Sequence, residues 1–500
     1  MIRNPVLPGF HPDPSILRVG DDYYLATSTF EWYPGVRVHH SRDLVHWRSL
    51  GGVLTDRRLL DLSGVPDSGG IWAPDLTYAN GLFHLVYGVM DNYGHGFKDI
   101  CNYLVTAPSI DGPWSDPVQL PGRGFDAALY HDEDGTSYLL NMVFDSRPGR
   151  GFAGIELQPL GGGEPRLILE NRHITEGPHV YKIDGWYYLM VAEGGTGYEH
   201  GATVLRSRSL EGPYEPDPAG PMFTSRHDPG LELQKAGHGC LVQTQDGDWY
   251  VAHLAARPST PRGRCVLGRE TAIQHVEWVD GWPRVAGGVA VVEVPAPALP
   301  PHPWPPAEEE WSTLRRPASP DWVTFDGDQV TIKGGQSPYG LRSPSLVARR
   351  VTGMKCAFEA SVTFEPGSVH QSAGITAYYN SRNWYHLAIT TDGLVLTGSD
   401  RGARTVHFTG DPASRLGLEF DGPVLRFSCD GKPIPVELDA TTLSDEYADE
   451  IIDGQIRAFG FTGAFVGLWV QDLAGEGGRA TFHDIRYRLL EDVGEPLREE

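Results

Sequence analysis

The chain has 500 residues, which is too long for one ordinary domain and predicts two to four units, although an all-β unit can exceed that size. Hydrophobic residues make up 40% of the chain, which excludes global disorder. Acidic residues (65) outnumber basic residues (41), and this net charge of −24 argues against a nucleic-acid partner.

We expect neither a membrane span nor a signal peptide. The chain contains no run of about 18 apolar residues, and the residues that follow Met1 lack the apolar segment of a signal peptide. The five cysteines are scattered and show no zinc spacing. They stand at Cys101, Cys240, Cys265, Cys356 and Cys429. Free thiols and a cytoplasmic location fit this pattern.

Residues 1–290 contain a weak repeat in which a turn is followed by an aromatic-rich strand. The turn positions are 21, 81, 135, 185 and 247. Asp-Gly and Asn-Gly between apolar runs are strong hairpin signals because these residues tolerate positive φ. Gly (61) and Pro (40) are frequent but not periodic, which indicates many tight turns, as in a large β protein.

Repeats of this length, each with several short strands and no long helical pattern, indicate propeller blades. Five copies predict a five-bladed β-propeller over residues 1–293. The alternative is a run of unrelated hairpins in a β-sandwich, because the intervals between the turns vary by up to 12 residues.

A change of composition separates the repeats from the rest of the chain. Residues 294–310 are rich in proline and end in three glutamates, which predicts a stiff, extended linker. Alternating segments such as 357–364 and 384–389 then predict strands of a second all-β unit, most simply a β-sandwich, over residues 311–492. The expected fold class is therefore all-β, with a propeller followed by a C-terminal sandwich.

One conspicuous polar residue precedes each turn of the repeat. In chain order these residues are Asp13, Asp75, Asp126, Glu176 and His238, which stand 8, 6, 9, 9 and 9 residues before the turn. The innermost strands of a propeller line its central channel, so equivalent spacing predicts that these side chains face one another. Clustered carboxyl groups raise one another's pKa, and a fold does not need them for stability. They suit glycoside hydrolysis, in which one carboxylic acid donates a proton and one carboxylate activates water or attacks.

Each of these acids also fits a local turn or cap, because Asp is common beside Pro and Gly. The matched spacing favours the functional interpretation for Asp13, Asp126 and Glu176 taken together. For Asp75 we expect a structural role, because the Trp-Ala-Pro-Asp sequence is typical of a turn that positions Trp72.

Four further residues leave alternatives open. His238 fits a core histidine, a ligand contact or the neighbour of a calcium ion bound through water. Phe30 and Trp72 fit either core packing or platforms for sugar faces. Arg269 fits either a salt bridge to Glu270 or a contact with substrate hydroxyls. The sequence contains no recognisable metal-binding motif.

Taken in order, the motifs around these residues resemble glycoside hydrolase family 43, and most closely its two-domain β-xylosidases. The motifs are NPVLPGFHPDPSI at 4–16, WAPD at 72–75, FD at 125–126, EGPH at 176–179 and LGRETAIQ at 267–274. HQSAG at 370–374 and GAFVG at 463–467 are similar to the C-terminal sandwich of those enzymes, so the resemblance covers nearly the whole chain. Ala127 departs from the pattern, which has proline after the central aspartate.

The resemblance implies a five-bladed propeller and hydrolysis with inversion at the anomeric carbon. It implies that Asp13 is the general base that activates water and that Glu176 is the general acid. Asp126 would raise the pKa of Glu176 and orient its carboxyl group.

Five substrate-binding residues are also implied by the resemblance. Arg269 and His238 match positions that contact the terminal sugar or stabilise the pocket floor. Phe30 and Trp72 match the aromatic walls of the pocket. Phe465 matches a residue on a sandwich loop that covers one side of the pocket, which favours release of single sugars over cleavage inside a polymer.

The implied function is an exo-acting inverting glycoside hydrolase that releases D-xylose from the non-reducing ends of short β-1,4-xylooligosaccharides. The alternatives are an α-L-arabinofuranosidase or an enzyme with both activities, because the two terminal sugars present similar hydroxyl patterns. A non-catalytic carbohydrate-binding propeller or an interaction scaffold would leave the three carboxyl groups unexplained. No cofactor is required, although calcium is compatible with the residues around His238. The resemblance also suggests a homodimer or homotetramer.

Overall fold

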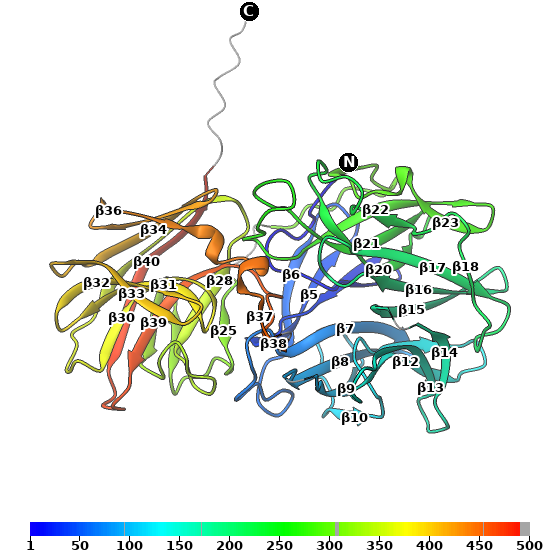
Figure 1. The fold of residues 1–500 in the computed structure, drawn as a ribbon, viewed down its shortest axis with the longest axis horizontal. Helices are drawn as coiled ribbons and strands as arrows, with labels where there is room; N and C mark the ends of the chain where they lie inside the picture. Colours follow the sequence, from blue (N-terminus) through cyan, green and yellow to red (C-terminus); the bar gives the residue numbers. More distant parts are fainter. Residues whose placement is uncertain (95, 172, 306–309, 454, 491–500) are drawn as a thin grey trace, which may run out of the picture.

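The computed structural model describes residues 1–94, 96–171, 173–305, 310–453 and 455–490. Two all-β bodies lie side by side, the propeller formed by the first part of the chain and the sandwich formed by the second (Figure 1). The expected fold class, an all-β five-bladed propeller followed by a β-sandwich, is confirmed. No described helix has the length and the apolar character that a membrane crossing needs.

Five antiparallel sheets form the blades. The first blade contains β2 (Ser15–Val19), β3 (Asp22–Thr27), β5 (Gly35–Ser41) and β6 (Arg48–Leu54), and the second contains β7 (Gly70–Ala79), β8 (Leu82–Asn92), β9 (Asp99–Ala107) and β10 (Val118–Leu120). The third contains β11 (Ala128–His131), β12 (Ser137–Asp145), β13 (Gly151–Pro159) and β14 (Arg166–Glu170), and the fourth contains β15 (Thr175–Ile183), β16 (Trp186–Glu193), β17 (Gly201–Ser207), β18 (Glu215–Pro216) and β19 (Phe223–Thr224). The fifth contains β20 (Gln234–Gln243), β21 (Trp249–Ala256), β22 (Glu270–Val279) and β23 (Trp282–Val285). The first strand of each blade contacts the first strands of the two adjacent blades, so β2, β7, β11, β15 and β20 surround the channel.

Each turn of the sequence repeat joins the first strand of a blade to its second strand. Asn80 and Asp184 have φ of 52° and 50°, as the Asn-Gly and Asp-Gly signals predict. The repeat therefore marks one hairpin per blade, and the alternative of unrelated hairpins in a sandwich does not hold for this part of the chain.

The N-terminal segment closes the ring of blades. Strand β1 (Ile2–Arg3) pairs with β24 (Glu293–Val294), and the short 3-10 helix η1 (Ala286–Gly288) precedes β24. The Asn4 side chain accepts a hydrogen bond from the Ile273 amide at 2.8 Å and donates to the Ile273 carbonyl at 2.7 Å. These contacts connect the start of the chain to the last blade.

The sandwich consists of two sheets with a buried apolar core between them. The first sheet, in spatial order, contains β33 (Ala403–Gly410), β32 (Gly393–Asp400), β31 (Asn383–Thr390), β30 (Gln371–Asn380), β39 (Phe465–Asp472), β28 (Leu346–Arg350), β25 (Ser312–Leu314) and β4 (Trp32–Tyr33). The second contains β26 (Val323–Asp326), β27 (Gln329–Lys333), β40 (Arg479–Leu489), β29 (Lys355–Thr363), β34 (Arg415–Asp421), β35 (Val424–Cys429) and β36 (Lys432–Asp439). Phe358, Ile375, Leu468 and Phe482 lie fully buried in this core.

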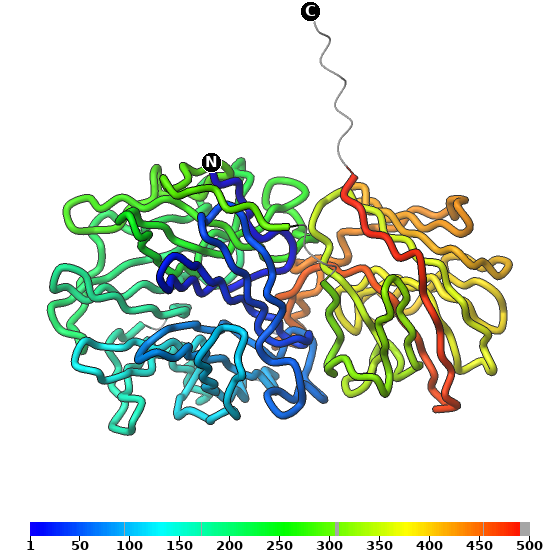
Figure 2. The backbone as a smooth tube through the Cα atoms, turned by 180° about the vertical axis from the view of Figure 1, so that it is seen from behind, coloured from blue at the N-terminus to red at the C-terminus, as the bar shows by residue number. Residues whose placement is uncertain are grey.

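Strand β4 belongs to the propeller part of the chain but pairs with the sandwich strand β25. The ring of Trp32 in β4 stacks on Phe465 of β39 at 4.0 Å between ring centroids. Figure 2 shows the blue N-terminal part of the chain lying against the yellow-green start of the sandwich. The two bodies are therefore joined by strand pairing and by apolar packing.

The described part of the predicted linker packs against the first blade. The His302 amide donates to Asp43 at 2.7 Å, and Trp304 donates to the His46 carbonyl at 3.2 Å. The Arg48 guanidinium lies 3.9 Å from the centroid of the Trp304 ring. Residues 306–309 of the predicted linker and residue 492, the predicted end of the second unit, lie outside the described residues.

Candidate active site

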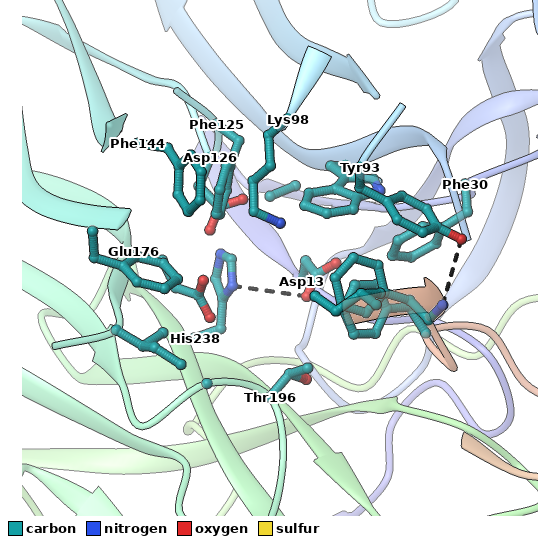
Figure 3. A pocket seen from close by; sticks show the side chains of 18 of the residues that line it. Asp13, Phe30, Tyr93, Lys98, Phe125, Asp126, Phe144, Glu176, Thr196 and His238 are labelled. Atoms are coloured by element: carbon teal, nitrogen blue, oxygen red, sulfur yellow. Dashed lines mark hydrogen bonds and ion pairs between the residues drawn. The ribbon is translucent and has the colours of Figure 1, made fainter. Parts of the chain in front are cut away.

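A cavity of about 550 Å³ lies at one end of the propeller channel, and residues from all five blades and from the sandwich line it. Asp13, Asp126 and Glu176 are among these residues, and Figure 3 shows their side chains in the same cavity. The volume falls within the range of pockets that bind small molecules. The structure thus brings together the three carboxyl groups that the sequence spacing selected.

Irregularities at the cavity end of the inner strands aim these side chains. The strand register shifts between Trp72 and Asp75, between Glu176 and His179, and between Gly237 and Cys240. Asp13, Asp126 and His238 have φ of 54°, 53° and 51°, a region that costs most non-glycine residues free energy. Bulges and positive φ re-aim side chains relative to the regular alternation of a strand.

Asp13 is held by donors on both carboxylate oxygens. The Ser28 hydroxyl donates to Oδ2 at 2.7 Å, and Arg269 Nη1 donates to Oδ1 at 2.9 Å. His238 Nδ1 lies 3.7 Å from Oδ1. Arg269 therefore pairs with Asp13 and not with Glu270.

Glu270 pairs instead with Arg257, at 2.7 Å. Of the two alternatives for Arg269, the salt bridge to Glu270 is not formed, whereas a contact with substrate hydroxyls stays a prediction, because Arg269 lines the cavity. Its guanidinium also fixes Asp13, the predicted base. It also donates to Thr196 Oγ1 and to the Phe461 carbonyl, each at 3.0 Å.

Burial raises the pKa of both remaining carboxyl groups. The pKa of Glu176 rises to about 7, first through burial and then through the charge of Asp13, while Lys98 and Arg269 oppose the rise. The pKa of Asp126 lies well above its ordinary value because of burial, then Glu176, then Asp13. The Gly177 amide donates to Asp126 Oδ2 at 3.1 Å. A protonated carboxyl group therefore persists beside Asp13 near neutral pH, as a general acid requires. That Asp126 tunes Glu176 stays a prediction.

His238, Phe30 and Trp72 also line the cavity, where the sequence predicted them. Burial lowers the pKa of His238 to about 4, so its imidazole is neutral at neutral pH. The Phe30 and Trp72 ring centroids lie 6.3 Å apart, and both rings contact Phe461. These aromatic rings provide apolar walls of the kind that bind sugar faces.

Phe465 requires a correction. Its side chain is fully buried in β39, between Trp32 and Phe10, and does not line the cavity. Phe459 and Phe461, a few residues earlier in the chain, line the cavity instead. Aromatic residues of the sandwich do line one side of the pocket, but the predicted residue, Phe465, is not one of them.

Lys98 is a cavity residue that sequence reasoning missed. Its ammonium group lies over four aromatic rings, at 5.0–5.4 Å from their centroids. The rings are those of Trp72, Phe125, Phe144 and Phe459. Burial lowers the pKa of Lys98, while the charges of Glu176 and Asp126 raise it. Lys98 lies directly before β9 and outside the sequence repeats, so no pattern in the sequence signalled it.

Asp75 lies outside the cavity lining, as the structural interpretation predicts. It is buried and accepts hydrogen bonds from the Ser15 hydroxyl at 2.9 Å and the Leu129 amide at 2.8 Å. Within the described ranges, His, Cys, Asp and Glu form no group of three or more that could hold a metal ion. The five cysteines are free. Calcium near His238 stays a prediction.

Comparisons with known proteins agree over the whole chain. Residues 2–283 match the model of glycosyl hydrolases family 43, and residues 305–488 match the β-xylosidase C-terminal concanavalin A-like domain. The chain is 42% identical to a β-xylosidase of Bacillus subtilis (strain 168), over 97% of this chain and 99% of that protein. It is 41% identical to xylosidase/arabinosidase 43B of Humicola insolens, over 98% of each chain.

A crystal structure of xylan β-1,4-xylosidase from Bacillus halodurans C-125 matches with a TM-score of 0.92 at 43% identity. That match covers 98% of this chain and 100% of the other. The two family models match the chain in the same order as the two bodies of the structure, first the propeller and then the sandwich. The chain belongs to glycosyl hydrolase family 43.

Proposed function

We propose that this protein is an exo-acting, inverting β-xylosidase that releases D-xylose from the non-reducing ends of short β-1,4-xylooligosaccharides. The proposal is carried by the presence of two different carboxyl groups in one cavity. Asp13 is fixed by Ser28 and Arg269, whereas burial raises the pKa of Glu176 to about 7. Relatives named β-xylosidase at similar length support the substrate class.

The reaction needs one proton donor and one proton acceptor. Glu176 donates its proton to the glycosidic oxygen as the bond to the anomeric carbon breaks. Asp13 accepts a proton from the water that attacks this carbon from the opposite face, so the new hydroxyl group has the inverted configuration. Arg269 keeps Asp13 oriented toward the cavity through the 2.9 Å contact.

The shape of the site supports exo action. Phe459 and Phe461 of the sandwich form one wall of the cavity, opposite the blades. A polymer cannot pass through a pocket that a second domain closes on one side, so a chain end enters instead. Single sugars from short oligosaccharides are the expected product.

The second candidate activity is that of an α-L-arabinofuranosidase, alone or together with the xylosidase activity. A relative named xylosidase/arabinosidase supports it. Discrimination between two sugars of similar hydroxyl pattern rests on a few contacts, each worth about 1–3 kcal/mol. We further propose that neither activity needs a cofactor, because the chain supplies both acid and base. A dimeric or tetrameric assembly and a cytoplasmic location stay predictions.

The acid assignment is tested by replacing Glu176 with alanine and comparing two leaving groups. Hydrolysis of xylobiose should fall by several orders of magnitude, because the departing sugar oxygen needs the proton. Hydrolysis of an aryl xyloside should fall far less, since its phenolate departs with little protonation. Asp13→Ala should disable both substrates, because both need activated water. Equal losses on both substrates with Glu176→Ala would contradict the acid role.

A further inference from the structure

One wall of the cavity comes from a sandwich segment whose described residues make no strand pair with the propeller. This segment contains α1 (Asp445–Ala448), β37 (Glu450–Ile452) and β38 (Gln455–Ala458), and among the described strands β37 and β38 pair only with each other. Figure 1 shows β37 and β38 between the two bodies. Asp449, Phe459 and Phe461 line the cavity from this segment. Side-chain contacts must therefore fix its position against the blades.

A buried ion cluster joins the start of this segment to the last blade. Lys235 of β20 is 4% exposed, and its Nζ lies 2.5 Å from Glu446 Oε1 and 3.6 Å from Asp445 Oδ2. The other carboxylate oxygens are also engaged. Tyr379 donates to Asp445 Oδ1 at 3.0 Å, and the Cys265 amide donates to Glu446 Oε2 at 2.8 Å.

The cluster formed by Lys235, Asp445 and Glu446 connects to the base on the propeller side. His200 Nδ1 donates to the Lys235 carbonyl at 2.9 Å, and His200 lines the cavity. His238 follows Lys235 in the same strand and lies 3.7 Å from Asp13. A shift of Lys235 would therefore move two cavity residues.

The same cluster connects to the base on the sandwich side. Asp449, at the end of α1, accepts a hydrogen bond from the Gly460 amide at 2.6 Å. The carbonyl oxygen of Phe461, the residue after Gly460, accepts a hydrogen bond from Arg269 Nη2 at 3.0 Å. Nη1 of the same guanidinium donates to Asp13 at 2.9 Å. Arg269 thus joins the sandwich wall directly to the base.

We propose that Lys235, through its ion pairs with Asp445 and Glu446, is a positioning residue for catalysis. It sets the place of the sandwich wall and, through Arg269, the orientation of Asp13. This inference rests on the proposed function, because it assigns Asp13 the role of base. Lys235 does not line the cavity, so it acts only through the residues that it holds.

The test compares four full-length variants with the wild type, in steady-state kinetics on whichever glycoside the wild type hydrolyses and in hydrogen–deuterium exchange. Lys235→Met and Glu446→Gln should each lower kcat/KM by about 10- to 100-fold, because displacement of a reacting group by about 1 Å has effects of that size. Both kcat and KM should change. Peptides that cover 455–463 should exchange faster than in the wild type.

Asp439→Asn is the matched control. It removes a negative charge from the same domain interface, where Asp439 lies 3.6 Å from Arg264, but it leaves Lys235 untouched. Its kcat and KM should stay within twofold of the wild type. Lys235→Arg, which keeps the charge, should recover part of the loss seen with Lys235→Met.

Wild-type kcat and KM in Lys235→Met, with only a lower melting temperature, would overturn the proposal and leave a structural ion cluster. If Lys235→Met does not fold, Glu446→Gln gives the answer, since it keeps the side-chain size. A wild type that hydrolyses no glycoside would contradict the proposed function, whereas unchanged exchange over 455–463 in Glu446→Gln would contradict the positioning role itself.

Discussion

Two carboxyl groups of the cavity have different surroundings, and this difference supports the proposed roles of base and acid. Asp13 accepts from a hydroxyl group and a guanidinium, whereas Glu176 lies where burial and the Asp13 charge raise its pKa to about 7. A buried carboxyl group whose pKa is raised into the neutral range is typical of the proton donor in an acid–base site. The residue types alone would not distinguish the acid from the base.

The raised pKa of Glu176 predicts the pH dependence of activity. The acid must be protonated, so kcat/KM should fall as pH rises through about 7. Lys98 lowers this pKa by its charge, so Lys98→Met should raise it and move the fall in kcat/KM upward, by up to about one pH unit. The measurement is kcat/KM from pH 5 to 9.

Lys182→Met is the control for this profile, because Lys182 pairs with Glu133 outside the cavity. Its profile should match that of the wild type. A downward shift in Lys98→Met, or no shift, would contradict the assignment of this limb to Glu176.

At the residue scale, the sequence located most of the site but not all of it. Asp13, Asp126 and Glu176 could be predicted because each stands eight or nine residues before a local turn signal. Lys98 could not, since nothing in its neighbourhood repeats. Phe461 was missed in favour of Phe465 because the chain enters β39 between them, and sequence spacing does not reveal which ring packs inward.

At the scale of elements, the inner strand of each blade starts at the cavity and ends at the hairpin turn, so the turn marks the end of the strand that is far from the cavity. Counting nine residues back from Gly81 reaches Trp72, so this tryptophan, and not Asp75, is the counterpart of Asp126 and Glu176. The register shift that follows Trp72 matches the shift that follows Glu176. Local turn chemistry made the blades predictable from sequence, whereas the bulges that aim the side chains depend on packing.

Gly177 is a position where this geometry leaves little room for a side chain. Its φ is 57°, its amide binds Asp126, and a Cβ atom there would lie 2.8 Å from His238 Nε2. Gly177→Ala should therefore lower kcat on xylobiose at least about tenfold and destabilise the fold by about 1–3 kcal/mol. Steady-state kinetics and urea unfolding measure the two effects.

Gly20→Ala separates strain from function. Gly20 has a similar φ of 63° and open space around its Cα, so this variant should lose some stability but keep its kcat. Equal kcat values for the two variants would mean that the position of His238 and Asp126 is not critical.

At the scale of the whole molecule, the two bodies share one interface and one active site. The sequence predicted a linker over 294–310, yet its described part packs on the first blade through His302 and Trp304. It also gave no sign that Trp32 and Tyr33 extend a sandwich sheet, because strand pairing across domains depends on contacts between distant parts of the chain. Composition and periodicity predict local structure, but they do not predict the contacts between folded domains.

Arg315 shows how strongly the two bodies depend on each other. It is fully buried in the sandwich part and donates to Asp67 of the propeller at 2.7 Å, and its charge also opposes the rise of the Glu31 pKa to about 7. Arg315→Met leaves two buried acids without their cation, and it should lower the free energy of unfolding by about 3–5 kcal/mol at pH 8.

The loss in Arg315→Met should be smaller at pH 6. A buried acid with a raised pKa destabilises the fold when ionised, so protonation of Glu31 as pH falls through about 7 removes part of the penalty. Urea unfolding at both pH values measures it. Arg415→Met, at an exposed ion pair with Glu359, should have a much smaller effect at either pH. A loss in Arg315→Met that does not depend on pH would contradict the role given to Glu31.

In the proposed mechanism, Asp13 and Glu176 hydrolyse a terminal β-xyloside with inversion. Time-resolved proton NMR of the wild-type protein with xylobiose tests it most directly, because the anomeric signals report which form of xylose appears before the two forms interconvert. Inversion at the anomeric carbon should make α-xylose appear first. Early β-xylose would contradict inversion and the base role of Asp13, and the absence of any xylose would contradict the β-xylosidase activity and favour the arabinofuranosidase.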